Sequence, residues 1–183
     1  YIKFIRFAQW KIEQNKEGIV GIISNNSYLS QIIHRRMREN LLQTFDRIYI
    51  LNLHGNSNIG EKCLDGSKDE NVFDIKVGVS IVLFVKNKKY KDKKVFYTDL
   101  WGKRDNKYEF LNNNTLSKVE FTELPRKKPN FFFIIKDMKS ERKYNKFIGL
   151  NDIFGCSTTG VKTHRDDFII EFDKSDLKNK IDK

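Results

Sequence analysis

With 183 residues, the chain is long enough for one domain, or for one domain and part of a second. Apolar residues make up 39% of it and include 15 Phe, which is enough for a core and argues against an intrinsically disordered chain. Lys and Arg outnumber Asp and Glu by 35 to 24, and the net charge of +11 favours a polyanionic partner such as nucleic acid. The alternative explanation is a Lys- and Asn-rich composition typical of an AT-biased genome.

The cysteines and the apolar runs bear on the cellular compartment. Cys63 and Cys156 lie far apart and form no Cys-x-x-Cys pair, which argues against a zinc ribbon or a disulfide scaffold and fits a reducing cytoplasm. No apolar run approaches the roughly 18 residues that a membrane helix needs, and no signal peptide opens the sequence. The sequence starts without Met, inside an amphipathic segment. We therefore expect a cytoplasmic fragment of a longer protein, without a membrane partner.

The first 45 residues predict a helix, a strand and a second helix. Residues 1–16 carry apolar side chains at helical spacing, and Gly18 ends this segment. Residues 19–23 (IVGII) are a short β-branched run, typical of a strand buried on both faces in a parallel sheet. The next helix, capped by Ser27 or Ser30, has an apolar inner face and a charged outer face. Its inward residues are Leu29, Ile32, Ile33, Met37 and Leu41, and its outward residues are Arg35, Arg38 and Glu39.

Two more strands are predicted in the first half of the chain. Residues 47–53 and 77–85 are apolar runs, and a polar, Gly-rich loop over residues 52–71 lies between them. The order helix, strand, helix, strand, loop, strand is typical of one end of an open α/β sheet whose earlier strands are missing. After residue 95 the pattern is irregular, although residues 131–135 (FFFII) predict one further strand.

Several short segments, taken in order, carry a family pattern. They are residues 18–29 (GIVGIISNNSYL), Met37-Arg38, Leu41-Leu42, residues 48–53, His54-Gly55-Asn56, and Val72-Phe73-Asp74 followed by residues 77–84. This series resembles gamma-type DNA methyltransferases that methylate adenine N6, above all large single-chain restriction-modification enzymes. In the resemblance, residues 72–84 correspond to a late strand hairpin with its preceding aromatic residue. Residues 160–168 (GVKTHRDDF) resemble the segment that opens the target recognition domain.

The resemblance implies a fold and a division of the chain. The fold would be α/β, the C-terminal part of a Rossmann-like methyltransferase sheet with its late strands and hairpin, followed by the start of a target recognition domain. Residues 1–95 would belong to the catalytic domain, 96–150 to a connecting segment and 151–183 to the recognition domain. The full enzyme would be a type II restriction-modification protein that flips adenine and transfers a methyl group from S-adenosylmethionine.

Two motifs of the family do not occur in this chain. They are the Asn-Pro-Pro-Tyr motif, which grips the adenine amino group, and the Gly-rich turn, which binds S-adenosylmethionine. Both would lie upstream of Tyr1. We therefore expect the isolated chain neither to bind S-adenosylmethionine nor to methylate DNA. Its expected partners are double-stranded DNA and the upstream methyltransferase half of the same polypeptide.

Phe73 is the candidate catalytic residue. An adenine inside duplex DNA cannot present N6 to a methyl donor, so the base must be flipped into a pocket. The resemblance implies that Phe73, before the hairpin, stacks on the flipped base. Such stacking contributes roughly 1–3 kcal/mol. The alternative is that Phe73 is a core residue beneath the loop.

Other candidate residues would contact the adenine pocket or DNA. Ser24, Asn25 and Asn26 end the first strand, and ligands of open α/β sheets bind outside the carboxyl ends of strands. The alternative for these three is an ordinary polar turn with caps. The basic cluster Arg35, Arg36 and Arg38 either binds phosphate or forms a solvated helix face. Lys162, Thr163, His164 and Arg165 either contact DNA phosphates or form a plain loop.

Metal chemistry is not expected. His34, His54 and His164 are separated and lack nearby ligands at metal-binding spacing. The rival to the enzyme hypothesis is a non-catalytic, basic nucleic-acid-binding module. An Asn-Pro-Pro-Tyr motif upstream in the gene would favour the enzyme, and its absence from the whole gene would favour the module.

Overall fold

The computed structural model describes residues 1–144, 146–156 and 170–182. The chain divides into two compact units, Tyr1–Lys136 and Asp137–Lys183. The helices of the first unit are α1 (Ile2–Asn15), α2 (Arg35–Thr44) and α3 (Arg104–Asn113). Its strands are β1 (Gly18–Asn25), β2 (Arg47–His54), β3 (Val79–Lys86), β4 (Lys94–Asp99) and β5 (Thr122–Glu123). Short 3-10 turns occupy Asn26–Leu29, Ile32–His34, Ser57–Ile59 and Leu116–Lys118.

The five strands form one mixed sheet in the order β1-β3-β2-β4-β5. β3 runs antiparallel to both of its neighbours, β1 and β2, whereas β2 and β4 are parallel. The strands β1, β2 and β4 therefore share one direction, and β3 is inserted between two of them in the opposite direction. The expected α/β class and the strands predicted over residues 47–53 and 77–85 are confirmed.

The first strand forms where it was predicted, but the prediction that it is buried on both faces of a parallel sheet was wrong. β1 pairs antiparallel with β3, and within the described residues its other edge has no strand beside it. Ile19 and Ile23 are 68% and 53% exposed, so β1 is not buried on both faces. A run of β-branched residues indicates a strand but carries no information on pairing direction or on what covers each face.

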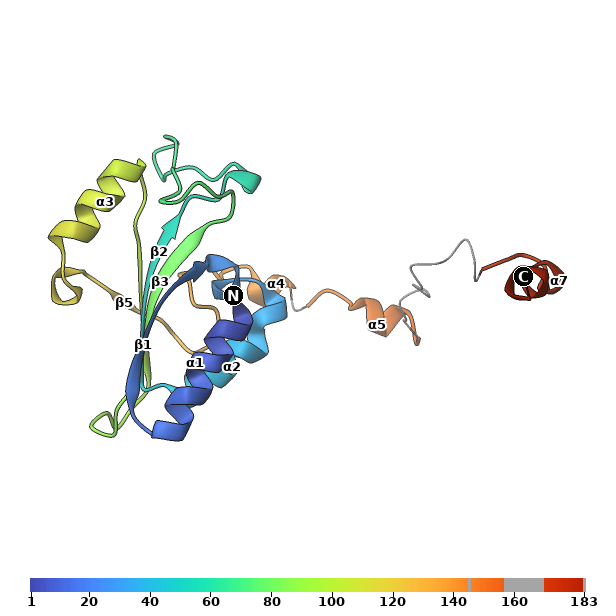
Figure 1. Cartoon of the computed structure of the whole chain (residues 1–183), viewed down its shortest axis with the longest axis horizontal. Helices are drawn as coiled ribbons and strands as arrows, with labels where there is room; N and C mark the ends of the chain where they lie inside the picture. The colour runs from blue at the N-terminus through green and yellow to red at the C-terminus, as the bar shows by residue number, and fades with distance from the viewer. Residues whose placement is uncertain (145, 157–169, 183) are drawn as a thin grey trace. The chain divides into compact units, whose positions relative to one another are not determined.

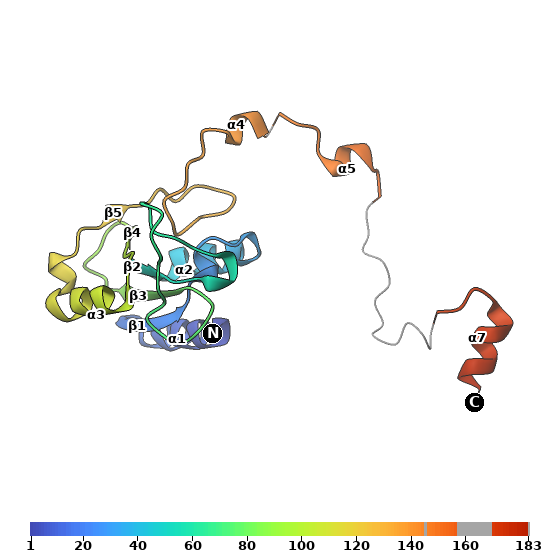
Figure 2. The ribbon, with the colours of Figure 1, turned by 90° about the horizontal axis from the view of Figure 1, so that it is seen from above.

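Helices cover both faces of the sheet. Figures 1 and 2 show α1 and α2 on one face and α3 on the other. The larger core cluster lies on the α1–α2 face and includes Leu41, Phe45, Ile48, Ile50, Val82 and Phe84. The smaller cluster lies on the α3 face, where Phe110 and Leu111 pack against Leu51, Leu53, Val72 and Val79. Alternation along each strand thus assigns even-numbered residues of β2 and β3 to one face and odd-numbered residues to the other.

Two segments differ from their predicted elements. The second helix begins only at Arg35, after two 3-10 turns, so Ile32 and Ile33 are exposed rather than inward. Residues 131–135 form no strand. Phe133 is nevertheless buried, and its backbone N–H donates to the Leu29 carbonyl at 2.9 Å. Apolar periodicity marked these residues as hydrophobic, but the local backbone was decided by tertiary packing.

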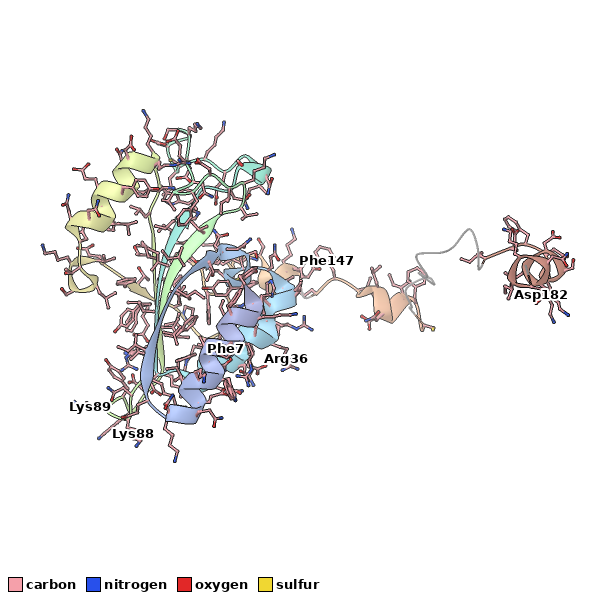
Figure 3. The ribbon with its side chains drawn as sticks, in the orientation of Figure 1. Phe7, Arg36, Lys88, Lys89, Phe147 and Asp182 are labelled. Atoms are coloured by element: carbon pink, nitrogen blue, oxygen red, sulfur yellow. The ribbon has the colours of Figure 1, made fainter. Side chains whose placement is uncertain are left out.

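The second unit contains α4 (Glu141–Tyr144), α5 (Leu150–Ile153) and α7 (Lys174–Ile181). Phe147, labelled in Figure 3, and Phe172 are both largely exposed. Residues 160–168, the expected opening of a recognition domain, lie outside the described residues. In the parts of the chain that the structure describes, no helix has the length and apolarity needed to cross a membrane.

Arg38 was predicted to lie on the outer face of α2, and this was wrong. Its side chain is fully buried and donates to three backbone carbonyls. The acceptors are Tyr28 at 2.6 Å, Gln31 at 2.9 Å and Asn130 at 2.7 and 3.0 Å. Burial lowers the pKa of Arg38 to about 10, so the guanidinium stays charged at neutral pH. Arg38 thus ties α2 to the turn before it and to the distant segment around residue 130.

Replacing Arg38 with Met should lower the free energy of unfolding by about 3 kcal/mol, because the buried Tyr28 carbonyl and the partly buried contacts to Gln31 and Asn130 lose a charged donor. Arg35→Met is the matched control, since Arg35 lies on the same helix and is exposed; it should change stability by about 0.5 kcal/mol or less. Urea unfolding followed by fluorescence measures both. Equal destabilisation by the two substitutions would contradict the role of Arg38.

Candidate functional site

The carboxyl ends of β1, β2 and β4 meet at one edge of the sheet. Register places four polar side chains in one row across this edge. Ser24 of β1 is opposite Ser80 of β3, Ser80 is opposite Asn52 of β2, and Asn52 is opposite Asp99 of β4. All four lie on the α1–α2 face. Side chains two residues apart on a strand share a face, and each of the four is two residues from a side chain that belongs to the larger core cluster or packs against it. A polar row therefore replaces the apolar core at this end.

Hydrogen bonds extend across this row. The Asn26 side-chain amide donates to Asn52 Oδ1 at 2.9 Å, and Asn52 Nδ2 donates to the Tyr97 hydroxyl at 3.0 Å. The Tyr97 hydroxyl in turn donates to Asp99. Burial and the nearby Asp99 carboxylate both raise the pKa of Tyr97, which keeps its hydroxyl a donor. One hydrogen-bonded series thus joins the ends of β1, β2 and β4.

His54 is the centre of the site. Its Nε2 lies 2.6 Å from Asp99 Oδ1, and its Nδ1 lies 2.8 Å from Glu61 Oε1. The imidazole is buried and stacks on Trp101, with ring centroids 3.3 Å apart and planes 16° apart. Both ring nitrogens face carboxylates, so the arrangement is suited to an imidazolium that donates from both.

The pKa values follow from this geometry. Burial opposes the charged form of His54, but hydrogen bonds to Asp99 and Glu61 outweigh it and raise the pKa. Burial alone would raise the pKa of Glu61, whereas its hydrogen bonds from His54 and the Asn56 backbone lower it overall. The histidine sits between carboxylates on opposite ring nitrogens, which is an ion-pair arrangement. Among the described residues, no group of three His, Cys, Asp or Glu side chains could hold a metal ion.

Phe73 lies in the loop between β2 and β3 and is 43% exposed. Its backbone is held in place although its ring is not buried. The Phe73 N–H donates to Asn71 Oδ1 at 2.9 Å, and Arg104 of α3 donates to the Phe73 carbonyl at 3.2 Å. Arg104 also pairs with Asp74 at 2.7 Å. Phe73 lines an open pocket of about 570 Å³ together with Asn71, Lys76 and Arg104.

A buried ion pair attaches the same loop to α3. Lys107 Nζ lies 2.7 Å from Asp69 Oδ1, and both side chains are fully buried. Lys107 also donates to the carbonyls of Leu53 and Glu70, each at 2.7 Å. A buried pair of this kind is costly to break from one side. Hence α3 fixes both the end of β2 and the middle of the loop.

The other predicted residues occupy different positions. Asn25 Oδ1 caps a 3-10 turn by accepting from the Ser27 N–H at 2.7 Å, and the Ser24 hydroxyl contacts the Asn25 carbonyl at 3.3 Å. The Asn26 N–H donates to the Gly78 carbonyl at 2.9 Å, which links β1 to the end of the loop that carries Phe73. Arg35 is exposed on α2, and its contact is with the Ile32 carbonyl. The structure thus brings Asn26 to the loop of Phe73.

Four predicted DNA contacts lie outside the described residues, namely Lys162, Thr163, His164 and Arg165. Several site residues were also missed. His54 belonged to the family pattern and was rejected as a metal ligand, but its partners Glu61 and Asp99 were missed, because they lie 7 and 45 positions away. A signal was available: a polar residue ends each of the strands β1, β2 and β4.

Three solved structures are similar to this chain over nearly its whole length. The first is the DrdV–DNA complex determined by cryo-electron microscopy, with 25% identity, a TM-score of 0.64 and 98% of this chain covered. The second is the ATP-dependent Type ISP restriction-modification enzyme LlaBIII bound to DNA, with 27% identity, a TM-score of 0.68 and 98% covered. The chain shares its fold with a segment of restriction-modification enzymes.

The third similar structure is a nuclease-deletion mutant of the Type ISP restriction-modification enzyme LlaGI in complex with a DNA substrate mimic. It is 22% identical, has a TM-score of 0.67 and covers 97% of this chain. The chain spans only 19%, 12% and 17% of the three proteins, respectively. Two of the three are named as Type ISP enzymes, whereas the sequence resemblance implied type II. No family model and no curated protein matches the chain.

The ion pairs of His54 predict a pH-dependent stability. Because the folded pKa of His54 lies above its ordinary value of 6.5, its contribution is complete below that pH and is lost as the pH rises through the folded value. The unfolding free energy of the wild type exceeds that of His54→Gln by an amount that should therefore be larger at pH 6 than at pH 9. Urea titrations across this range measure it.

His34→Gln is a control with the opposite sign. Burial and the neighbouring Arg38 lower the pKa of His34, so its contribution is present above its ordinary pKa and is lost as the pH falls. A difference between wild type and His54→Gln that stays constant from pH 6 to pH 9 would contradict an imidazolium between two carboxylates.

Proposed function

We propose that the chain is the rear portion of an adenine-N6 DNA methyltransferase of a restriction-modification system. In the full-length enzyme, a flipped adenine would receive a methyl group from S-adenosylmethionine. The observation that carries the proposal is the exposed Phe73, presented beside the carboxyl ends of β1, β2 and β4 in a fold shared with restriction-modification enzymes. Open α/β sheets bind their ligands at this edge. A soluble, cytoplasmic setting accords with this function.

An upstream half of the same polypeptide is the first proposed partner. β1 presents a free edge in the described sheet, with exposed Ile19 and Ile23. On α1, the side chains of Phe4, Phe7 and Trp10 are exposed, and Figure 3 labels Phe7 on this helix. An apolar edge strand beside exposed aromatic residues is suited to further strands and helices of the same domain. The upstream half would supply the Asn-Pro-Pro-Tyr motif and the methyl-donor site.

S-adenosylmethionine does not fit the residues of this chain alone. The sequence contains no Gly-rich turn of the kind that the family uses for the donor. The proposed contribution of this chain is to the base instead. Phe73 would stack on the flipped adenine, while Ser24, Asn25 and Asn26 would line the pocket or support its backbone. Asn26 donates through its backbone N–H to the Gly78 carbonyl at the end of the loop that carries Phe73, which links the end of β1 to that loop.

Double-stranded DNA is the second proposed partner. The three similar proteins are described as bound to DNA or to a DNA substrate mimic. Arg35, Lys162, Thr163 and Arg165 would contact phosphates, which position a protein on DNA without reading its sequence.

Phe73→Ala, tested in the full-length enzyme, should reduce the population of flipped adenine by roughly 5- to 150-fold, because stacking of roughly 1–3 kcal/mol is lost. Methylation of duplex DNA should fall to the same extent, while affinity for the methyl donor is unchanged. Phe73→Trp should keep much of the activity. A 2-aminopurine at the target position reports flipping by its fluorescence.

The matched control is Tyr90→Ala, an exposed aromatic in the turn between β3 and β4, which should leave flipping unchanged. Since Phe73 is 43% exposed and outside both core clusters, its replacement should cost far less than the 3–5 kcal/mol of a core Phe. Wild-type flipping in a destabilised Phe73→Ala enzyme would show that Phe73 is structural and would end the stacking hypothesis.

DNA binding by the 183-residue chain alone should be weak, nearly independent of sequence and strongly weakened by salt. The net charge of +11 favours phosphate contacts, and each such contact releases counterions. Fluorescence anisotropy at several salt concentrations measures the slope. Tight binding to one DNA sequence, not weakened by salt, would contradict the proposal that sequence-specific recognition requires the rest of the enzyme.

A further inference from the structure

The chain turns sharply where β2 ends, at His54 and Gly55. Both residues have a positive φ, 53° and 83° respectively, and the register with β3 shifts between Asn52 and His54. Side chains are rarely found in this left-handed conformation. At Gly55 a side chain is excluded in any case, because its Cβ would lie 2.4 Å from the Asn71 Cα. The turn therefore brings the start of the β2–β3 loop against Asn71.

Asn71 connects this turn to Phe73. Its Nδ2 donates to the Gly55 carbonyl at 3.0 Å and to the Val77 carbonyl at 2.7 Å. Its Oδ1 accepts from the Phe73 N–H at 2.9 Å. The placement of the Phe73 backbone thus depends on a carbonyl that directly follows His54.

His54 is held from three directions. Asp99 of β4 contacts Nε2, Glu61 of the loop contacts Nδ1, and Trp101 stacks on the ring. Glu61 also accepts from the Asn56 N–H at 2.8 Å, so it closes the turn on itself. The other polar and charged groups nearby are Asn52, at 3.5 Å from Nδ1, Tyr97, which donates to Asp99, and Lys107, which acts on Glu61 electrostatically.

We propose that His54 is a positioning residue for Phe73. Its protonated ring bonds to both Asp99 and Glu61 and so stabilises the turn at Gly55. Asn71 binds this turn and positions the backbone of Phe73. The importance of this placement for base stacking rests on the proposed function. A neutral imidazole has one N–H, so deprotonation removes one of the two donated bonds and sets a lone pair against a carboxylate. The loop that carries Phe73 should then open more often.

Hydrogen exchange of the Phe73 amide in the 183-residue chain tests this directly. The protection factor, which corrects for the intrinsic dependence of exchange on pH, should fall about tenfold as the pH rises through the titration of His54, the equivalent of one hydrogen bond to a charged group. NMR follows the imidazole titration in the same samples. The amide of Ile50, in the sheet core, reports global unfolding, so its dependence on pH measures the change in overall stability. Local opening of the loop is shown by protection of Phe73 that is lower than that of Ile50 and falls with the His54 titration.

Two variants, His54→Gln and Glu61→Gln, and the control His34→Gln separate positioning from simple loss of stability. In His54→Gln, protection of Phe73 should be low and free of the pH step, whereas His34→Gln should retain the step. Glu61→Gln should move the step to lower pH, because one of the carboxylates that raise the pKa of His54 is gone. This second variant remains informative if His54→Gln fails to fold.

Protection of the Phe73 amide that is unchanged across the His54 titration, or a step that persists in His54→Gln, would overturn the proposal. The measurement needs neither DNA nor a methyl donor. Its failure would therefore leave adenine stacking by Phe73 untouched, and a full-length enzyme that fails to methylate adenine would leave the coupling of His54 to the loop standing.

Discussion

The ion pairs of one buried histidine connect the parts of the candidate site. Asp99 belongs to β4, His54 ends β2, and Glu61 belongs to the loop that leads to Phe73. Carboxylates on both sides of the ring favour its charged form despite burial, and Trp101 covers its face. From β1, Asn26 reaches the same network through Asn52 and Tyr97. The His54 side chain therefore connects the loop between β2 and β3 to the hydrogen bonds that join the ends of β1, β2 and β4.

The positive charge of the chain is not concentrated at this site. Arg38 and Lys107 are buried and bind backbone carbonyls, so two of the cations have structural roles. The pocket beside Phe73 is mixed in sign, since Arg104 and Lys76 lie near Asp74 and Glu70. Figure 3 shows Lys88 and Lys89 in the turn between β3 and β4, at the opposite end of the sheet. The pocket therefore differs from the exposed Lys side chains of that turn, which carry charge of one sign.

The sequence was sufficient to predict the class of fold and the main strands, because β-branched apolar runs and Gly-rich breaks are local signals. The order of segments before the hairpin also led to Phe73 as the stacking candidate, and that role stays a prediction. The sequence was insufficient for Arg38, since helical spacing placed this residue outward, whereas its guanidinium is buried against the carbonyls of Tyr28, Gln31 and the distant Asn130. The same holds for His54, whose partner Asp99 is brought beside it by the parallel pairing of β2 with β4. Contacts of this kind depend on which strands are neighbours in the sheet, and a local sequence pattern does not reveal them.

Adenine methylation by the full-length enzyme, which we propose, is tested by its product. Duplex DNA would be incubated with the full-length polypeptide and S-adenosylmethionine, digested to nucleosides and examined by mass spectrometry. N6-methyladenine should form, with no methylated cytosine, and no product should form when the donor is omitted. Methylcytosine, or DNA binding and cleavage without any methylated adenine, would contradict the proposal.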